Sequence, residues 1–302
     1  MDKTGDSFQL DAASRQNPCA GCGGLPALPA QPVGGGAGFA EWFDSLPTMA
    51  AGRDLRELVA AIVAARAAHR PVHLSLGAPV VEAGVGPVLA DLVERGIVTA
   101  VSVNGEYLWR ELALAAAGFT GSPAAADRDI GAALAAMLEA AQQDDGGLGR
   151  AATTYLGTQS LSYARYSVLA SCHRYRVPVT VHGAPPQSDS VAIPSAVAAR
   201  DFARLTELAG ESAGGAHLNI GDPVGLPKVF RRALDAARRA GREARGLICA
   251  DLESAAPSRP PDDPGPTAAG GREIRLIGHH EILVPLLAAA LVHRLWDPAE
   301  DE

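Results

Sequence analysis

Three side chains that could carry protons or bind a metal stand together near the C-terminal end: His279, His280 and Glu281, in the stretch IRLIGHHEILVPLL. One apolar run precedes them and another follows, which predicts a strand before them and a helix after them. They could ligate a metal, clamp a cofactor or only begin the helix, where the helix dipole favours a carboxylate. Because Ser or Asp caps a helix better than His, we expect a functional role for at least one of the two histidines.

Further residues, all but one of them polar or glycine, follow other apolar runs in the same way. They are Gly77, Ala78, Glu82, Gly84, Asn104, Gly105, Glu106, His182, Asp189, Asn219 and Asp222. Glycine turns would let backbone N–H groups approach a ligand, and helix N-termini would favour an anion such as a pyrophosphate. No turn matches Gly-x-Gly-x-x-Gly or the P-loop, so the indication of a nucleotide depends on the whole set.

The elements that must position these residues alternate along the chain. Strand-like runs lie within 71–81, 97–105, 177–189, 215–223, 245–253 and 273–278, and helical patterns within 53–70, 84–96, 106–118, 130–143, 160–176, 196–211, 226–241 and 280–296. Short apolar strands separated by helices are typical of a parallel sheet covered on both faces. We predict a doubly wound α/β fold with a mainly parallel sheet, which binds ligands at the carboxyl ends of its strands.

Two of these residues have simpler interpretations that stay open. His182 could only hydrogen-bond a neighbouring turn, and Asp222, directly before a proline, could only cap the helix that begins near Leu226. A zinc site would need three converging ligands, for example from His182, His217, His279 and Glu281. None of these four residues is part of a His-x-x-x-His spacing, so we expect no metal.

The net charge and the remaining segments of the sequence bear on the partners, the location and the domain organisation of the protein. The net charge of −8 argues against a nucleic-acid partner. No apolar stretch is long enough for a membrane span and the first residues are polar, so we expect a cytoplasmic protein. Residues 1–48 are rich in Gly and Pro and predict a flexible leader, in which Cys19 and Cys22 form half of a zinc knuckle. Residues 49–302 predict a single domain.

Four segments together resemble one known family. VHLSLGAPVVEAGVGPVLADLVERGIVTAVSVNGEYLWREL, ASCHRYRVPVTVHGAPPQSD, GAHLNIGDPVGLPKVFRRAL and GHHEILVPLLAAAL are similar, in the same order, to segments of deoxyhypusine synthases. The chain most resembles the divergent bacterial branch of that family, from about residue 55 to residue 295. Scarce lysine beside plentiful arginine and alanine also suggests a GC-rich bacterial genome.

The resemblance implies a Rossmann-like NAD-binding domain in a homotetramer. Members of this family oxidise spermidine with NAD and transfer its aminobutyl group through an imine on an enzyme lysine. By this resemblance, residues 78–82 and 103–105 would hold the dinucleotide, with His280 near its adenosine end and Asp189 near the polyamine.

The sequence departs from the family at its central residue. The catalytic lysine of the family aligns with Leu226, and Lys228 lies two residues further on. Two residues turn a helix by about 200°, so Lys228 need not replace that lysine. The acidic Gly-Ser-Asp-Ser-Gly loop of the family is also replaced, by the Pro-rich SAAPSRPPDDPG.

The leading hypothesis is an enzyme that acts on an amine or polyamine with NAD, on a substrate other than a translation factor. The predicted roles are: catalytic His279, Glu281, His182 and Lys228; substrate-binding Asp189, Asp222, His217 and Asn219; cofactor-binding Gly77, Ala78, Glu82, Gly84, Asn104, Gly105, Glu106 and His280. Two alternatives keep the fold. One is a hydrolase or transferase with a His/Glu site, with or without metal. The other is a non-catalytic protein that binds a nucleotide or polyamine.

Overall fold

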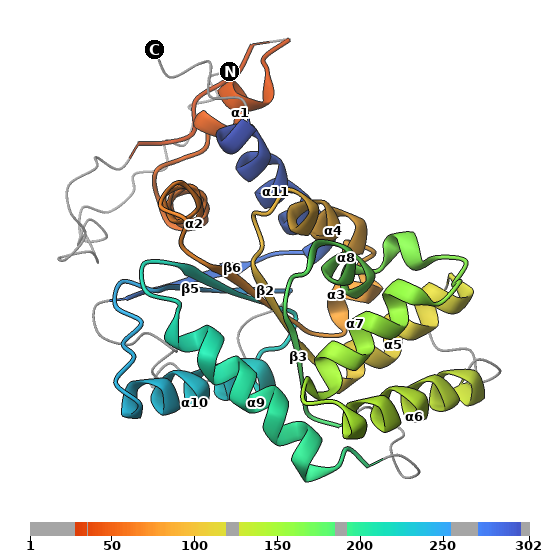
Figure 1. Cartoon of the computed structure of the whole chain (residues 1–302). Helices are drawn as coiled ribbons and strands as arrows, with labels where there is room; N and C mark the ends of the chain where they lie inside the picture. Colours follow the sequence, from red (N-terminus) through yellow and green to blue (C-terminus); the bar gives the residue numbers. More distant parts are fainter. Residues whose placement is uncertain (1–27, 35, 119–126, 185–191, 255–270, 297–302) are drawn as a thin grey trace, which may run out of the picture.

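A single parallel sheet forms the centre of the protein (Figure 1). The computed structural model describes residues 28–34, 36–118, 127–184, 192–254 and 271–296. Within these residues the strands are β1 Val72–Leu76, β2 Ala100–Asn104, β3 Val179–His182, β4 Ala216–Ile220, β5 Ile248–Glu253 and β6 Arg272–Ile277. Every strand pair is parallel, and the order is β3-β2-β1-β4-β5-β6. The predicted doubly wound α/β fold is confirmed, with the strand order of Rossmann folds.

Helices cover both faces of the sheet. They are α1 Phe39–Asp44, α2 Ala50–Ala67, α3 Pro79–Glu82, α4 Gly86–Glu94, α5 Gly105–Ala117, α6 Asp127–Gln143, α7 Gly147–Thr158, α8 Val168–Tyr175, α9 Ser195–Gly210, α10 Gly225–Arg239 and α11 His280–Trp296, with a 3₁₀ turn, η2, at Ala164–Tyr166. In Figure 1, α2, α4 and α11 lie above the sheet and α9 and α10 below it, while α5, α6 and α7 extend beyond β3. No helix in the described residues is long and apolar enough to cross a membrane.

The two faces of the sheet differ in chemistry. Under α2, α4 and α11 the sheet presents apolar residues, such as Leu74 and Leu218, which meet Leu89 and Leu287. The opposite face presents buried polar residues: His73, Ser75, Ser102, Thr180 and His217. Buried polar groups need partners, so this second face must be satisfied by hydrogen bonds between side chains.

Several elements differ from the prediction, including the short α3, which begins in a stretch predicted as a strand with a loop. Helix α1 lies within the stretch predicted as an irregular leader, and its Phe43 is buried in the core. Helix α7 was not predicted, because its glycines mimic a loop; a Cβ on Gly149 would come 2.1 Å from the carbonyl oxygen of Val179. The helix predicted over 160–176 begins only at Val168, because the hydroxyl of Ser167 caps it by accepting from the N–H of Ala170.

The turns that follow β1 and β4, where the strand order reverses, lie close together. A Cβ on Gly77 would come 2.2 Å from the carbonyl oxygen of Gly221, so only glycine permits this approach. Gly221 has a φ of +76°, which also favours glycine. A Cβ there would meet Pro79 at 3.3 Å and His280 at 3.4 Å. These two glycines therefore allow the two turns, Pro79 and His280 to pack closely at the point where the strand order reverses.

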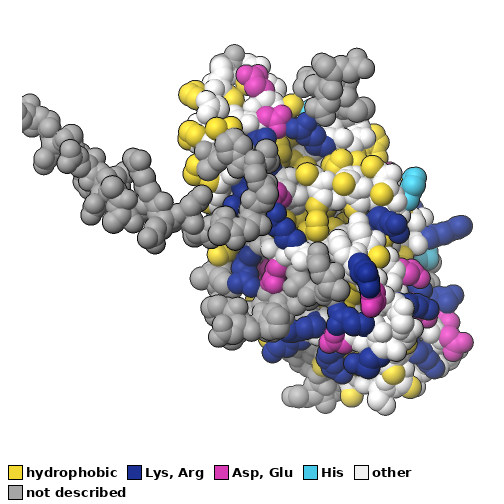
Figure 2. All heavy atoms as spheres, turned by 90° about the vertical axis from the view of Figure 1, so that its left-hand side faces the viewer, with side chains coloured by type: hydrophobic (Ala, Val, Ile, Leu, Met, Phe, Trp, Pro, Cys, Tyr) yellow, Lys and Arg dark blue, Asp and Glu magenta, His cyan; other side chains and the backbone are white. Residues whose placement is uncertain are grey.

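One face of the molecule shows a mixture of exposed apolar and basic side chains. In Figure 2, hydrophobic side chains gather in the upper half of that face and Lys and Arg in the lower half. The large apolar residues that are exposed in the described part of the chain include Trp42, Met49, Ile277, Ile282 and Trp296. Two of them, Ile277 and Ile282, lie at the end of edge strand β6 and in the first turn of α11.

Candidate functional site

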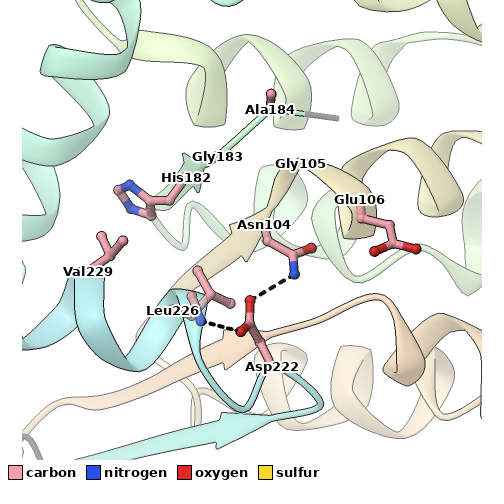
Figure 3. Close-up of a pocket in the computed structure, with 10 residues that line it drawn as sticks. Asn104, Gly105, Glu106, His182, Gly183, Ala184, Asp222, Leu226 and Val229 are labelled. Carbon is pink, nitrogen blue, oxygen red and sulfur yellow. Dashed lines mark hydrogen bonds between the residues drawn. The ribbon is translucent and has the colours of Figure 1, made fainter. Parts of the chain in front are cut away.

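A cavity of about 260 Å³ opens at the carboxyl ends of the strands. It is lined by Asn104, Gly105, Glu106, His182, Gly183, Ala184, Asp222, Gly225, Leu226 and Val229. These residues end or follow β2, β3 and β4, or stand in the first two turns of α5 and α10 (Figure 3). The expectation that polar residues after different strands meet at one edge therefore holds for this group.

Asp222 has the central position in this cavity. Its Oδ2 accepts a hydrogen bond from Nδ2 of Asn104 at 2.9 Å. Its Oδ1 accepts from the backbone N–H groups of Val224, at 3.1 Å, and Gly225, at 2.6 Å. Figure 3 shows the carboxylate between β2 and the start of α10. A carboxylate offers about four lone-pair positions, so Asp222 can hold the start of α10 and still accept from a ligand.

The wall near Asn104 carries an excess of negative charge. Arg110 pairs with both Glu106 and Glu82, each at 2.9 Å. Two carboxylates around one guanidinium leave one net negative charge, and Asp222 adds a second. No Lys or Arg is among the residues that line the cavity in the described part of the chain. The carboxylates thus favour a cationic ligand, against the opposite preference of the N-termini of α5 and α10, which also line the cavity.

His182 is the titratable ring of the cavity. Only 8% of the residue is exposed, and its Nε2 shares a hydrogen bond of 2.9 Å with Oγ1 of Thr180. Burial lowers the pKa of His182 to about 4, so the ring is neutral at neutral pH. His182 therefore bonds a side chain of its own strand, and not a turn, and it also lines the cavity.

The three residues at the end of β6 do not line the cavity. His280 is buried, and its Nε2–H donates to the carbonyl oxygen of Leu252 at 3.1 Å. His279 and Glu281 are exposed, and their side chains lie 3.5 Å apart. The structure therefore separates this predicted group into one packing residue and two solvent-exposed residues.

Two further predicted residues are buried beneath α10. The ring of His217 stacks on that of Phe230, with centroids 3.6 Å apart. Asn219 donates to the carbonyl oxygen of Asp222 at 2.7 Å and to Oδ1 of Asp251 at 3.1 Å. Neither lines the cavity, although Asn219 supports the loop that carries Asp222.

The residues predicted for a cofactor divide in the same way. Asn104, Gly105 and Glu106 line the cavity, whereas Gly77, Ala78, Glu82, Gly84 and His280 do not. The N–H of Gly77 donates to the carbonyl oxygen of Ile220, so it is not available to a ligand. Ala78 is buried. Asp189 lies outside the described residues.

Helix α10 contributes the apolar wall, which sequence reasoning did not assign. Leu226 and Val229 line the cavity, whereas Lys228 is exposed and lies outside it. The signal that could have found them is the helical spacing of 225, 226 and 229, which places these positions on one face. Leu226 is also the position that aligns with the lysine of the deoxyhypusine synthases.

Two kinds of bound group can be tested against these residues. Among the described residues, no three His, Cys, Asp or Glu side chains are grouped so that they could hold a metal ion. A pocket for a drug-sized ligand has about 300–1,000 Å³, so 260 Å³ accommodates a small amine or one ring of a dinucleotide. The carboxylates of Asp222 and Glu106 would repel a pyrophosphate. The cavity therefore does not fit a whole NAD molecule.

No protein-family model matches the sequence, and no curated protein matches it. Solved structures do resemble it. One is ArgZ, an arginine dihydrolase from the ornithine-ammonia cycle in cyanobacteria, with a TM-score of 0.54 and 14% identity over 81% of this chain and 32% of that one. Another is AgrE in complex with ornithine and NAD⁺, with a TM-score of 0.53 and 12% identity over 83% of this chain and 34% of that one.

A third structure is of similar length. It is a protein from Entamoeba histolytica that is provisionally described as a deoxyhypusine synthase, with a TM-score of 0.54 and 10% identity over 87% of this chain and 96% of that one. The chain thus spans about a third of ArgZ and AgrE but matches the third protein over nearly its whole length. At these identities the likeness shows the fold. The fold implied by the resemblance to deoxyhypusine synthases is confirmed.

Proposed function

We propose that the chain binds a small cationic amine in the cavity at the carboxyl ends of β2, β3 and β4 and takes part in its chemical conversion. The single observation that supports this is the carboxylate of Asp222 on a wall without a lining Lys or Arg in the described residues. An aliphatic diamine, a polyamine end or a basic amino acid has the matching charge and size.

The lining residues suggest how such an amine would be held. Asp222 accepts from the ammonium group, since its carboxylate keeps a free lone-pair position. The methylene groups lie against Leu226 and Val229, which are on the adjacent face of α10. His182, neutral at neutral pH, can accept a proton from the bound group. Removal of that proton is the first requirement for oxidation or transfer at an amine nitrogen.

A second candidate adds a nicotinamide cofactor that oxidises the amine to an imine. The strand order of Rossmann folds and the likeness to AgrE, which was solved with ornithine and NAD⁺, favour it. The small volume and the carboxylates of the cavity oppose binding of a whole dinucleotide inside it. The experiment below therefore includes NAD as a separate ligand.

Calorimetric titration and thermal unfolding test the proposal. We expect putrescine, spermidine, ornithine or arginine to bind and stabilise the protein, by about 2.7 kcal/mol at a hundredfold excess over Kd. Asp222→Asn should weaken binding by at least about tenfold, the effect of losing one charge-assisted contact. Equal affinity in wild type and Asp222→Asn would contradict the proposal, as would the absence of binding by all four amines.

Two controls separate charge from structure. The exchange Asn104→Asp with Asp222→Asn keeps an amide and a carboxylate in contact and keeps the net charge, so it should retain most of the binding. Glu281→Gln removes an exposed carboxylate outside the cavity and should not change the affinity. Stabilisation by NAD alone, and more strongly with an amine, would support the second candidate.

The predicted homo-oligomer stays a prediction. Sedimentation equilibrium of the purified chain gives its mass directly. A mass near four times 31.0 kDa would agree with the homotetramer implied by the resemblance.

A further inference from the structure

A continuous chain of hydrogen bonds runs between side chains across three adjacent strands. Nε2 of His182 on β3 lies 2.9 Å from Oγ1 of Thr180, which lies 2.7 Å from Oγ of Ser102 on β2. That hydroxyl lies 2.9 Å from Nε2 of His73 on β1. All four residues are at least nine-tenths buried. This chain of hydrogen bonds thus connects two imidazole rings through two hydroxyl groups.

The two ends of this chain reach different cavities. His182 lines the amine cavity at the carboxyl edge of the sheet. His73 lines a second cavity, of about 230 Å³, which includes Pro71, Thr99 and Pro178, the residues that precede β1, β2 and β3. Nδ1 of His73 is buried and has no hydrogen-bond partner in the described part of the chain. The second cavity beside this ring has room for a water molecule, which would supply the missing partner.

Hydroxyl groups impose a direction on the chain. Each hydroxyl has one proton and two lone pairs, so the two rings cannot both accept at Nε2 while all three hydrogen bonds form. A proton can pass along the whole chain of hydrogen bonds when every group donates to the next in the same sense. In one such state His182 donates from Nε2 and His73 accepts at Nε2, so His73 carries its proton on Nδ1. In the other such state the directions and both tautomers are reversed, so in either state the two rings hold opposite tautomers.

We infer that His182, Thr180, Ser102 and His73 form a proton relay that carries a proton from the amine cavity to the second cavity. This relay rests on the proposed function, since it serves the amine bound beside His182. Nδ1 of His182 takes a proton from the amine nitrogen, whose electron pair stays on nitrogen. Its Nε2 proton passes to Thr180, the Thr180 proton to Ser102, and the Ser102 proton to Nε2 of His73. Nδ1 of His73 then releases its proton to water.

This arrangement suits a buried site because no ring has to become cationic. Burial lowers the pKa of His73 to about 3, with His182 nearby as a smaller cause, so an imidazolium is unfavourable there. A tautomer change moves the proton while each ring stays neutral. His217 lies beside His73, with ring centroids 5.5 Å apart, but its Nε2 is bonded to Oγ of Ser75 and is outside the chain. The charged residues at the second cavity are Arg204 and Glu211.

Long-range ¹H–¹⁵N correlation spectra of protein labelled with [¹⁵N]histidine test the relay without any ligand. In the free wild type we expect the two rings to hold opposite tautomers. The fraction of molecules with a proton on Nδ1 of His73 and the fraction with a proton on Nδ1 of His182 should therefore add up to one. In Thr180→Val, which removes one hydroxyl, and separately in Ser102→Ala, this relation should be lost. Ser75→Ala is the matched control: it removes a buried hydroxyl from the same face and should leave the relation intact. The same tautomer on both rings of the wild type would overturn the relay.

Titration with putrescine then separates the two proposals. If the amine binds, the tautomers of His182 and His73 should change together in the wild type, and only that of His182 in Thr180→Val. A change confined to His182 in the wild type would overturn the relay while leaving amine binding in place. Opposite tautomers in the free protein without any amine binding would refute the proposed function and leave the hydrogen-bonded chain established.

Discussion

The protonation state of a buried side chain in this protein depends on its surroundings. Glu111, which lies outside the cavity, is an example. Its Oε1 accepts from the N–H of Leu169 at 3.1 Å, while its Oε2 has no partner among the described residues. Burial raises the pKa of Glu111 to about 7, against lowering by hydrogen bonds from residues such as Leu169 and Ser167. The protonated form is therefore favoured in the folded protein over a range in which the unfolded chain is ionised.

Replacing Glu111 by Gln should stabilise the protein at alkaline pH. The pKa is 4.5 in the reference state and about 7 in the fold, so the wild type loses stability as the pH rises between these values. The shift corresponds to roughly 3 kcal/mol at pH 8, which a neutral amide should largely restore, with little change at pH 5. Urea unfolding at both values measures this. Glu139→Gln, an exposed site on α6, is the control. A stabilisation by Glu111→Gln that is equal at pH 5 and pH 8 would contradict this cause.

At the scale of elements, helix α10 decides which residue faces the site. Leu226 is 2% exposed and lines the cavity, whereas Lys228 is exposed on another side of the helix. The rotation of about 200° between these positions accounts for the difference. Covalent chemistry on Lys228 in this cavity is therefore not supported by its position.

Lys228→Ala should leave amine binding unchanged. The side chain is exposed and outside the cavity, so its removal alters neither the charge nor the shape of the lining. Calorimetric titration of the variant with the same amines as the wild type gives the comparison. A tenfold or larger loss of affinity would show that Lys228 reaches the ligand.

Helix α7 packs so closely on β3 that its glycine is required. Gly149→Ala would place a Cβ 2.1 Å from the carbonyl oxygen of Val179, and the backbone would have to shift. We expect a destabilisation of about 1–3 kcal/mol, the usual cost of overpacking. Gly131→Ala in α6, where nothing lies within 4 Å, should instead stabilise by about 0.4–1 kcal/mol. Urea unfolding of both variants tests the pair, and similar effects of the two changes would contradict this account.

The same contrast explains what the sequence could predict. Strands β1 to β5 were found because each is a short and almost fully buried run, and the carboxyl ends of the strands identified Asn104, His182 and Asp222 as neighbours. Helix α7 was missed because its glycines serve packing. Leu226 and Val229 were missed because an apolar residue in a helix has the same sequence signature whether it lines a core or a cavity. The sequence also did not show that His279 is exposed and His280 is buried, because that difference depends on tertiary packing.

At the scale of the whole molecule, five buried groups give the stability a pH optimum. Burial lowers the pKa of His73 to about 3 and of His182 to about 4, and lowers that of His217 well below 6.5. These groups make the protein more stable as the pH rises towards 6.5, because the unfolded chain binds the protons. Burial raises the pKa of Glu111 and Asp201 to about 7, so these two lower the stability as the pH rises towards 7.

These opposed contributions predict a maximum of stability near pH 6.5. Urea unfolding between pH 5 and pH 8 would locate it. Glu111→Gln should move the maximum to a higher pH, because it removes one of the two groups that lower the stability on the alkaline side. A stability that rises steadily through pH 8 in the wild type would contradict these assignments.

The hydrogen bond between Asn104 and Asp222 joins residues that are 118 positions apart in the chain. Contacts of such long sequence separation form only after a large loop has closed, which makes them late events in folding. The cavity consequently does not exist in a chain that has completed only its first three strands. Amine binding would then report the end of folding, because a ligand can stabilise only those molecules in which both halves of the sheet are already paired.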